Sequence, residues 1–216
     1  MRNYLSIIVF VITSVVFLSS SYGDCRRGRL PEVGEWVTYS ILSHKTRMEL
    51  KLSIVGEEML ERDRGLWFEM IVRTGDLDFI IKRLITGDPL KPAKVYRQIV
   101  KIVNKRMGDY SPAIETPIGD TSGVESSLKD FPCLNKAGEK GAYKHRGKIY
   151  NAHIIKTEKP VKNLIVFSEE IPFFGIIKME SEDSIIELLD YGKGATTQIT
   201  EEPFRLDTPN PDGGQR

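Results

Sequence analysis

The chain has 216 residues, of which 40% are hydrophobic and 28% are charged, a composition that suits one globular domain or at most two small ones. Its 31 Lys and Arg residues balance its 30 Asp and Glu residues, so the net charge is +1. That balance argues against a dedicated nucleic-acid-binding protein, which needs a basic excess to neutralise phosphates. The apolar content argues against an acidic disordered protein. No nucleic-acid partner is therefore expected.

The first residues have the pattern of a secretory signal peptide. Arg2 is the one charged residue in residues 1–23, residues 4–18 are apolar or carry small hydroxyls, and Ser21 and Gly23 precede the expected cleavage site. The apolar run is shorter than the roughly 20 residues of a membrane-spanning helix, so a retained anchor is the weaker alternative. We expect export, with no integral membrane span after cleavage.

The two cysteines, Cys25 and Cys133, both lie after the expected cleavage site. An oxidising compartment permits a disulfide between them, which would stabilise the fold by about 4–5 kcal/mol in the chain-entropy model. Two unpaired thiols are the alternative. Their spacing is not Cys-x-x-Cys, so a thioredoxin-like role has no support, and Asp24 argues against lipidation of Cys25.

Apolar and polar residues alternate with period two through the first half of the exported chain. Strands are expected over residues 36–41, 48–54, 66–73 and 78–85, because each range has one apolar and one polar face. Short polar connections such as residues 43–46 join them. Without helix-length crossovers, consecutive strands of this kind form antiparallel meanders.

The middle of the chain is less regular. Residues 87–89 (GDP) should end the fourth strand, and one helical turn running into a strand is expected over residues 94–104. Residues 105–147 are rich in Gly, Pro, Ser, Lys and Asp, which predicts mainly loop with a short strand at 113–118. A loop that long is uncommon inside a domain, and either a lid over the sheet or a mobile surface loop would fit.

Alternation returns over residues 148–191, where four further strands are expected. They cover residues 150–154, 164–167, 175–180 and 184–190. Another short strand is expected at 195–200. The polar, Pro- and Gly-rich residues 201–216 predict a disordered tail.

These elements predict a mainly β fold with little helix. The expected architecture is a single antiparallel sheet of about eight to ten strands, curved into a half-barrel or an open barrel. The domain organisation is a signal peptide (1–23), an exported β-rich domain (24–200, with 105–147 as a long loop region) and the tail (201–216).

No catalytic or metal-binding motif stands out. His44, His145 and His153 are not at metal-ligand spacing, and the chain has no Gly-x-Ser-x-Gly nucleophile turn. No enzyme activity, cofactor or metal is therefore expected. A hydrolase would need a polar cluster in a cleft, for example around His145.

Large apolar residues collect on the inward faces of the expected strands. They would fill an ordinary core if a second layer covers the sheet, or line a cavity for a lipid chain if the sheet is strongly curved. The expected ligand-binding residues are Tyr39, Leu50, Leu52, Phe68, Met70, Phe79, Ile154 and Phe174.

The segment Ile171-Pro172-Phe173-Phe174-Gly175 places two Phe residues in an expected turn. Phe173 is the candidate for a contact with a partner protein or a membrane. The alternative is that one or both Phe side chains fold back onto the core.

Several short motifs carry a family resemblance. They are VFSEEIP at 166–172, GIIK at 175–178, LLDYG at 188–192, GEWV at 34–37, LWFE at 66–69 and GDP at 87–89. In these motifs the chain resembles the LolA/LolB/LppX-like periplasmic proteins. The resemblance implies an antiparallel sheet curled into a half-barrel, helices that plug its open side, and the carriage of lipoproteins or lipids in the bacterial periplasm. This chain has little amphipathic helix to act as the plug.

Two functional hypotheses follow. The first is an exported, non-enzymatic binding protein of the cell envelope, periplasmic or extracellular, that carries a lipid, a lipoprotein or another apolar ligand on the concave sheet face. The second is a structural or assembly module that docks another envelope protein through a sheet edge or the Phe173-Phe174 turn.

Overall fold

A computed structural model describes residues 29–44, 46–61, 63–116, 138–157 and 163–205. Within these ranges the chain forms thirteen strands of one sheet and no helix. The predicted mainly β fold with a single curved, open sheet is confirmed. The expected signal peptide and both cysteines lie outside the described residues.

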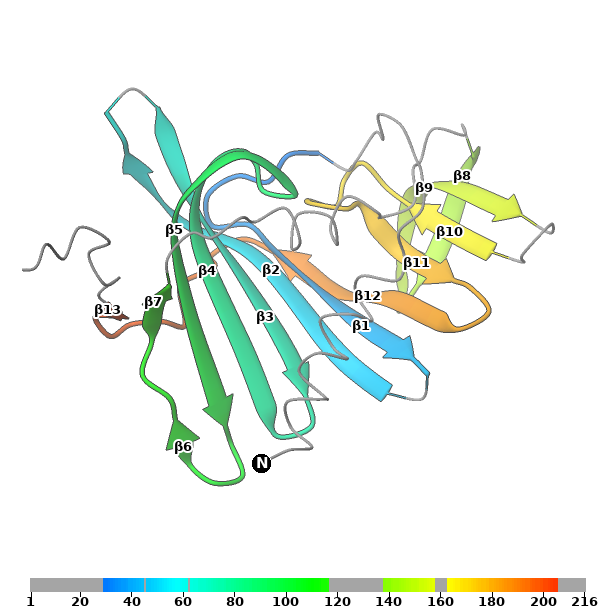
Figure 1. The fold of residues 1–216 in the computed structure, drawn as a ribbon. Helices are drawn as coiled ribbons and strands as arrows, with labels where there is room; N and C mark the ends of the chain where they lie inside the picture. Colours follow the sequence, from blue (N-terminus) through cyan, green and yellow to red (C-terminus); the bar gives the residue numbers. More distant parts are fainter. Residues whose placement is uncertain (1–28, 45, 62, 117–137, 158–162, 206–216) are drawn as a thin grey trace, which may run out of the picture.

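Five long strands form the first half of the sheet and pair antiparallel in chain order (Figure 1). Their alternating burial follows from the alternating sequence, because successive side chains of a strand point to opposite faces. The first four expected strands are confirmed. The five are β1 (Trp36–Ser43), β2 (Thr46–Met59), β3 (Arg64–Thr74), β4 (Leu77–Asp88) and β5 (Lys91–Asn104).

Five more strands form the second half, again in chain order. β12 pairs antiparallel with β1, so the chain's first and last long strands join the two halves into one sheet, with Tyr39 opposite Leu188. The expected strands in this part are confirmed. The five are β8 (Glu139–His145), β9 (Lys148–Thr157), β10 (Asn163–Phe167), β11 (Ile176–Glu180) and β12 (Ser184–Gly192).

Three short strands extend the sheet beyond β5. β6 (Asp109–Tyr110) and β7 (Ile114–Thr116) each pair antiparallel with β5, and β13 (Phe204–Arg205) pairs parallel with β7. β13 and β8 are therefore the outermost strands of the described sheet.

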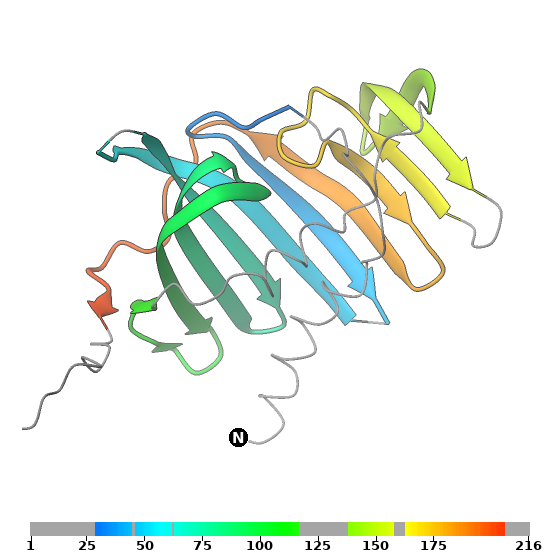
Figure 2. The ribbon, with the colours of Figure 1, turned by 45° about the horizontal axis from the view of Figure 1, so that its top comes forward.

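The sheet bends, and the tip of the β4–β5 hairpin curls back over one of its faces (Figure 2). Two register shifts explain this bend, at Leu84/Ile85 and at Thr86/Gly87. Bulges of this kind increase local twist and bend the strand that carries them. Leu90 at the tip is thereby buried among apolar residues from the sheet.

The two faces of the sheet carry separate apolar clusters. On β3, Phe68 belongs to the main cluster and Ile71 to the second cluster, because an odd spacing along a strand places side chains on opposite faces. The second cluster is Ile71, Ile80, Ile99, Ala113 and Ile199. The main cluster is Val37, Tyr39, Leu50, Leu52, Ile54, Phe68, Ile85, Leu90, Val95, Tyr150, Ala152, Val166, Ile171, Phe173, Phe174, Ile176, Ile177, Met179, Ile186 and Leu188.

Several sequence predictions are wrong in detail. Residues 94–104 contain no helical turn, because β5 is continuous from Lys91 to Asn104. Residues 139–145 were expected to be loop but form strand β8. Residues 195–200 were expected to be a strand but form none, and Ile199 of this segment belongs to the second cluster. The described strands outnumber the expected eight to ten.

The predicted disordered tail is wrong for its first residues, because β13 is an ordered strand that pairs with β7. Residues 206–216 lie outside the described residues. The question of a lid at 105–147 falls largely on residues 117–137, which are also outside them.

Candidate functional site

Most of the predicted ligand-binding residues come together on one face of the sheet. Met70 and Ile154 are partly buried against the main cluster. Phe79 belongs to neither cluster, although it lies opposite Val72 of the main-cluster face. The other five are buried members of the main cluster: Tyr39, Leu50, Leu52, Phe68 and Phe174.

Tyr39 places a polar group inside this apolar cluster. Its side chain is 1% exposed and its ring lies 6.5 Å from that of Phe174. The hydroxyl lies near the Ile176 backbone, yet it makes no hydrogen bond of normal geometry. Burial raises the pKa of the Tyr39 phenol far above its ordinary value, so the hydroxyl stays protonated and keeps an unused donor.

An unpaired buried hydroxyl is costly. Leaving such a group without a partner costs about 1–3 kcal/mol, and most buried polar side-chain atoms are hydrogen-bonded. An oxygen atom of a bound ligand would remove this cost at Tyr39. The hydroxyl is therefore the feature of the main cluster that an ordinary core does not explain.

The turn between β10 and β11 packs onto the same cluster. Phe173 is 1% exposed, its ring centroid lies 6.0 Å from that of Phe68, and its φ is 65°. A positive φ is unfavourable for a bulky residue. The prediction that Phe173 forms an exposed contact is wrong, because its side chain is buried; the alternative, folding back onto the core, is what the structure has.

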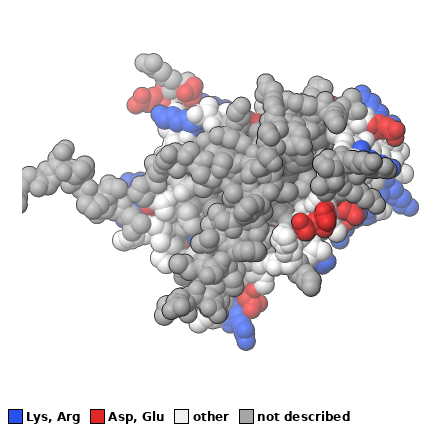
Figure 3. Space-filling view, turned by 45° about the vertical axis from the view of Figure 1, so that its right-hand side comes forward, with Lys and Arg blue, Asp and Glu red and all other residues white. Residues whose placement is uncertain are grey.

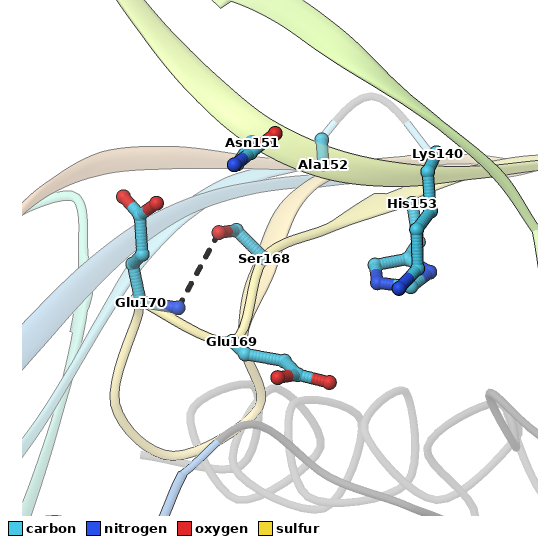
Figure 4. A pocket seen from close by; sticks show the side chains of 7 residues that line it. All are labelled: Lys140, Asn151, Ala152, His153, Ser168, Glu169 and Glu170. Atoms are coloured by element: carbon cyan, nitrogen blue, oxygen red, sulfur yellow. Dashed lines mark hydrogen bonds between the residues drawn. The ribbon is translucent and has the colours of Figure 1, made fainter.

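A polar pocket of about 260 Å³ lies beside this turn (Figure 4). Ser168 and Ala152 are buried, whereas the charged side chains are exposed at its rim. The Ser168 backbone N–H donates to the Gly175 carbonyl at 2.8 Å, and the Glu170 N–H donates to Ser168 Oγ at 3.3 Å. The lining residues are Lys140, Asn151, Ala152, His153, Ser168, Glu169 and Glu170.

The pocket forms where β10 leaves β9. The β9–β10 pairing ends where Phe167 lies opposite His153. The rings of these two residues stack, with their centroids 4.8 Å apart. Beyond that point the chain turns away through residues 168–170, and β9 continues beside β8 alone. The pocket therefore combines side chains from β8, β9 and the β10–β11 turn.

The pocket brings a serine, a histidine and carboxylates together without the geometry of a catalytic triad. Ser168 Oγ accepts the Glu170 N–H and makes no hydrogen bond to His153 among the described contacts. Nucleophilic catalysis needs a hydrogen bond between nucleophile and base. His145, the example given for a residue around which a catalytic cluster could form, instead forms a hydrogen bond with the Leu188 carbonyl through Nε2 at 2.8 Å.

That His145 contact is one of several that curl the second half of the sheet. Lys148 pairs with Asp190 at 3.5 Å, and the rings of Tyr150 and Tyr191 lie 6.5 Å apart. The β8–β9 hairpin thus reaches back to the end of β12. The curl places Tyr150 and Ala152 in the main cluster beside residues of β1.

Charges on the described surface are mixed in sign. Figure 3 shows acidic and basic side chains close together around the rim of the face in view, with no extended patch of one sign on its described part. In the described ranges, no group of three or more His, Cys, Asp or Glu residues could hold a metal ion. No helix among those same residues is long and apolar enough to cross a membrane.

The outer edge strand bears on the docking hypothesis. β8 is the last strand on its side of the described sheet, and it presents the exposed residues Lys140 and Lys144. Lysines on an edge strand oppose pairing with another chain. Since Phe173 is buried as well, neither the β8 edge nor the Phe173-Phe174 turn gains support as a docking element.

Comparison with known proteins gives no relative: no protein-family model, no curated protein and no solved structure matches the chain. The resemblance to LolA/LolB/LppX-like proteins therefore rests on its short motifs alone.

Proposed function

We propose that the protein is an exported, non-enzymatic binding protein of the cell envelope that carries a lipid, a lipoprotein or another apolar ligand on the main cluster. The unpaired hydroxyl of Tyr39 is the observation that carries this proposal. The expectation of export comes from residues 1–23 of the sequence.

The main cluster would bind the apolar part of the ligand by contact alone. Each Å² of apolar surface removed from water contributes about 25 cal/mol. Tyr39 would donate its hydroxyl proton to one oxygen of the ligand, such as a carboxylate or ester oxygen. That bond forms in a site of low polarity, where hydrogen bonds are electrostatically stronger than in water.

The β10–β11 turn would have to move to admit the ligand, because Phe174 packs on Tyr39 and Phe173 packs on Phe68. The positive φ of Phe173 costs free energy in the closed state. Displacing the two rings would relieve that cost and replace their contacts by contacts with the ligand.

Binding of a fluorescent long-chain fatty acid tests this proposal. Wild-type protein should bind it, and Tyr39→Phe should weaken binding about fivefold to tenfold, since one hydrogen bond contributes about 1 kcal/mol. Tyr150→Phe is the matched control, because Tyr150 is a buried tyrosine of the same cluster and should leave the affinity unchanged. Absence of binding by the wild-type protein would contradict the proposal.

A further inference from the structure

The segment before β1, residues 29–35 (the arm), contacts the β10–β11 turn (Figure 2). The Arg29 backbone forms an isolated parallel β-bridge with Pro172, which directly precedes buried Phe173. The Phe173 ring packs on Phe68 and is one of the two rings that close the main cluster. The arm therefore contacts the part of the turn that covers the proposed ligand site.

The side chain of Arg29 joins the arm to the start of the sheet. Its guanidinium donates two hydrogen bonds of 2.6 Å, one to each carboxylate oxygen of Glu35. The Glu35 side chain is 1% exposed and also accepts the Glu32 N–H at 2.9 Å. Charge-assisted bonds of this bidentate kind are among the strong hydrogen bonds of proteins. Arg29 thus contacts the turn through its backbone and Glu35 through its side chain.

Glu35 itself is fixed to the sheet. Its backbone carbonyl accepts the Ile54 N–H of β2 at 3.0 Å, and the Gly34 N–H donates to the Ile54 carbonyl at 2.7 Å. The Gly34 carbonyl in turn accepts the Ala195 N–H at 2.8 Å. These bonds attach Gly34 and Glu35 to β2 and to the segment after β12, so Glu35 is a fixed anchor for Arg29.

The rest of the arm buries little apolar surface. Leu30 is 64% exposed and Val33 is 40% exposed, and Pro31 is the one buried residue of positions 30–33. Segments with few buried apolar contacts open at a low cost in free energy. The Arg29–Glu35 pair is therefore the contact whose loss should release the arm, and with it the turn.

The turn itself carries backbone strain that favours opening. Phe173 has a φ of 65°, and such strain persists only where surrounding contacts oppose it. The Ser168 N–H donates to the Gly175 carbonyl at 2.8 Å and closes the base of the turn. Residues 169–174 would therefore move as a loop while β10 and β11 stay paired. The bridge between Arg29 and Pro172 lies in the middle of this loop, where it opposes the movement.

We propose that the Arg29–Glu35 pair is a latch that holds the β10–β11 turn closed over the main cluster, and that its release opens the cluster to an apolar ligand. The entry of a ligand rests on the proposed function, whereas the latch is a property of the ligand-free protein. A contact made only in the closed state lowers the population of the open state, and the apparent affinity for a ligand falls by the same factor.

Hydrogen exchange of the ligand-free protein at the amides of Phe173 and Phe174 tests the latch. Arg29→Met should raise their exchange rates about fivefold, the upper end of the range for partly exposed ion pairs. Arg29→Lys keeps the charge without the bidentate geometry and should raise them less. Arg97→Met is the matched control, because it removes a similar bidentate pair between β5 and Glu115 of β7, and it should leave both rates unchanged.

Unchanged exchange at Phe173 and Phe174 in Arg29→Met would overturn the latch, and so would an equal increase in Arg97→Met. Neither result depends on whether the wild-type protein binds a ligand.

The association rate of a fluorescent long-chain fatty acid tests the role of the latch in ligand entry. Arg29→Met should raise this rate about fivefold, in step with the larger open population. Equal association rates in Arg29→Met and wild type, despite faster exchange in the variant, would overturn that role. Faster exchange in Arg29→Met without any fatty-acid binding by the wild-type protein would support the latch while contradicting the proposed carrier function.

Discussion

The two faces of the sheet differ in how they treat a buried polar group. On the face of the second cluster, the Glu69 side chain is 1% exposed. Its carboxylate accepts hydrogen bonds from Thr197 Oγ1 at 2.6 Å and from the Gln198 N–H at 3.2 Å. In the main cluster, Tyr39 is equally buried, and its hydroxyl makes no hydrogen bond of normal geometry. One face has a satisfied polar group, and the other has an unused donor.

This difference separates a completed core from a candidate binding site. The segment that follows β12 covers the second face and supplies both the apolar contact of Ile199 and the hydrogen bonds to Glu69. Burying a charge is tolerated when hydrogen bonds compensate it. The described residues provide no acceptor of normal geometry for the Tyr39 hydroxyl proton, which is why we propose the main cluster as the place of ligand binding.

The largest expected effect is on the packing of the main cluster. Leu52 is fully buried there, so Leu52→Ala should lower the free energy of unfolding by about 2–5 kcal/mol. Denaturant unfolding would measure this loss. A loss below about 1 kcal/mol would show that the main cluster can collapse around a missing side chain and is not tightly packed at Leu52.

The next effect concerns the second face. Glu69→Ala leaves Thr197 and Gln198 without their acceptor and should lower the free energy of unfolding by about 2–3 kcal/mol. Hydrogen exchange should also increase in residues 195–200. Glu139→Ala, at an exposed carboxylate of β8, is the control. If hydrogen exchange in residues 195–200 is unchanged in Glu69→Ala, Glu69 does not hold this segment against the second face.

A smaller effect is expected at the pair that anchors the chain before β1. The Arg29 guanidinium donates two hydrogen bonds of 2.6 Å to buried Glu35. The Arg29 backbone forms an isolated β-bridge with Pro172 of the β10–β11 turn. Hydrogen bonding to Arg29 lowers the pKa of Glu35 below its ordinary 4.5. The pair therefore stabilises the fold above about pH 4.5, and this contribution is lost as the pH falls through the lowered pKa.

Arg29→Met should accordingly lower the free energy of unfolding by about 1 kcal/mol at neutral pH, a value reduced by the solvent exposure of Arg29. The difference from wild type should shrink as the pH falls below 4.5. Unfolding curves at several pH values would measure it. A difference that stays constant down to pH 2 would exclude the ion pair as its cause.

The smallest effect on stability is expected at Tyr39 itself. Tyr39→Phe removes an unpaired hydroxyl and keeps the ring, so the free energy of unfolding should stay the same or rise by up to about 1 kcal/mol. Thermal or denaturant unfolding of the ligand-free protein would measure this. A loss of more than 1 kcal/mol would mean that the hydroxyl has a partner in the free protein, and it would remove the difference between the two faces.

Local alternation was enough to predict most of the sheet. Residues such as Leu50 and Leu52 alternate with charged neighbours, and this pattern placed both the strand and its buried face correctly. The pattern failed at β5, where a register shift between Val95 and Arg97 leaves Val95 and Ile99 in clusters on opposite faces of the sheet. It also failed at β8, whose outward residues are mostly exposed and polar.

The functional features depend on contacts between distant residues, which alternation does not encode. Ser168 and Lys140 meet only because β8 and the β10–β11 turn flank β9. The sequence singled out Tyr39 as apolar lining, but its missing hydrogen bond depends on the position of Ile176 in space. The burial of Phe173 likewise depends on Phe68, far away in the sequence.

Native mass spectrometry of the protein purified from the cells that make it, followed by extraction with organic solvent, tests the central claim most directly. The account predicts a lipid-sized adduct on the wild-type protein that solvent releases, and a smaller bound fraction on Tyr39→Phe purified in parallel. A wild-type protein that carries no such adduct, or the same bound fraction on both proteins, would contradict ligand binding through Tyr39.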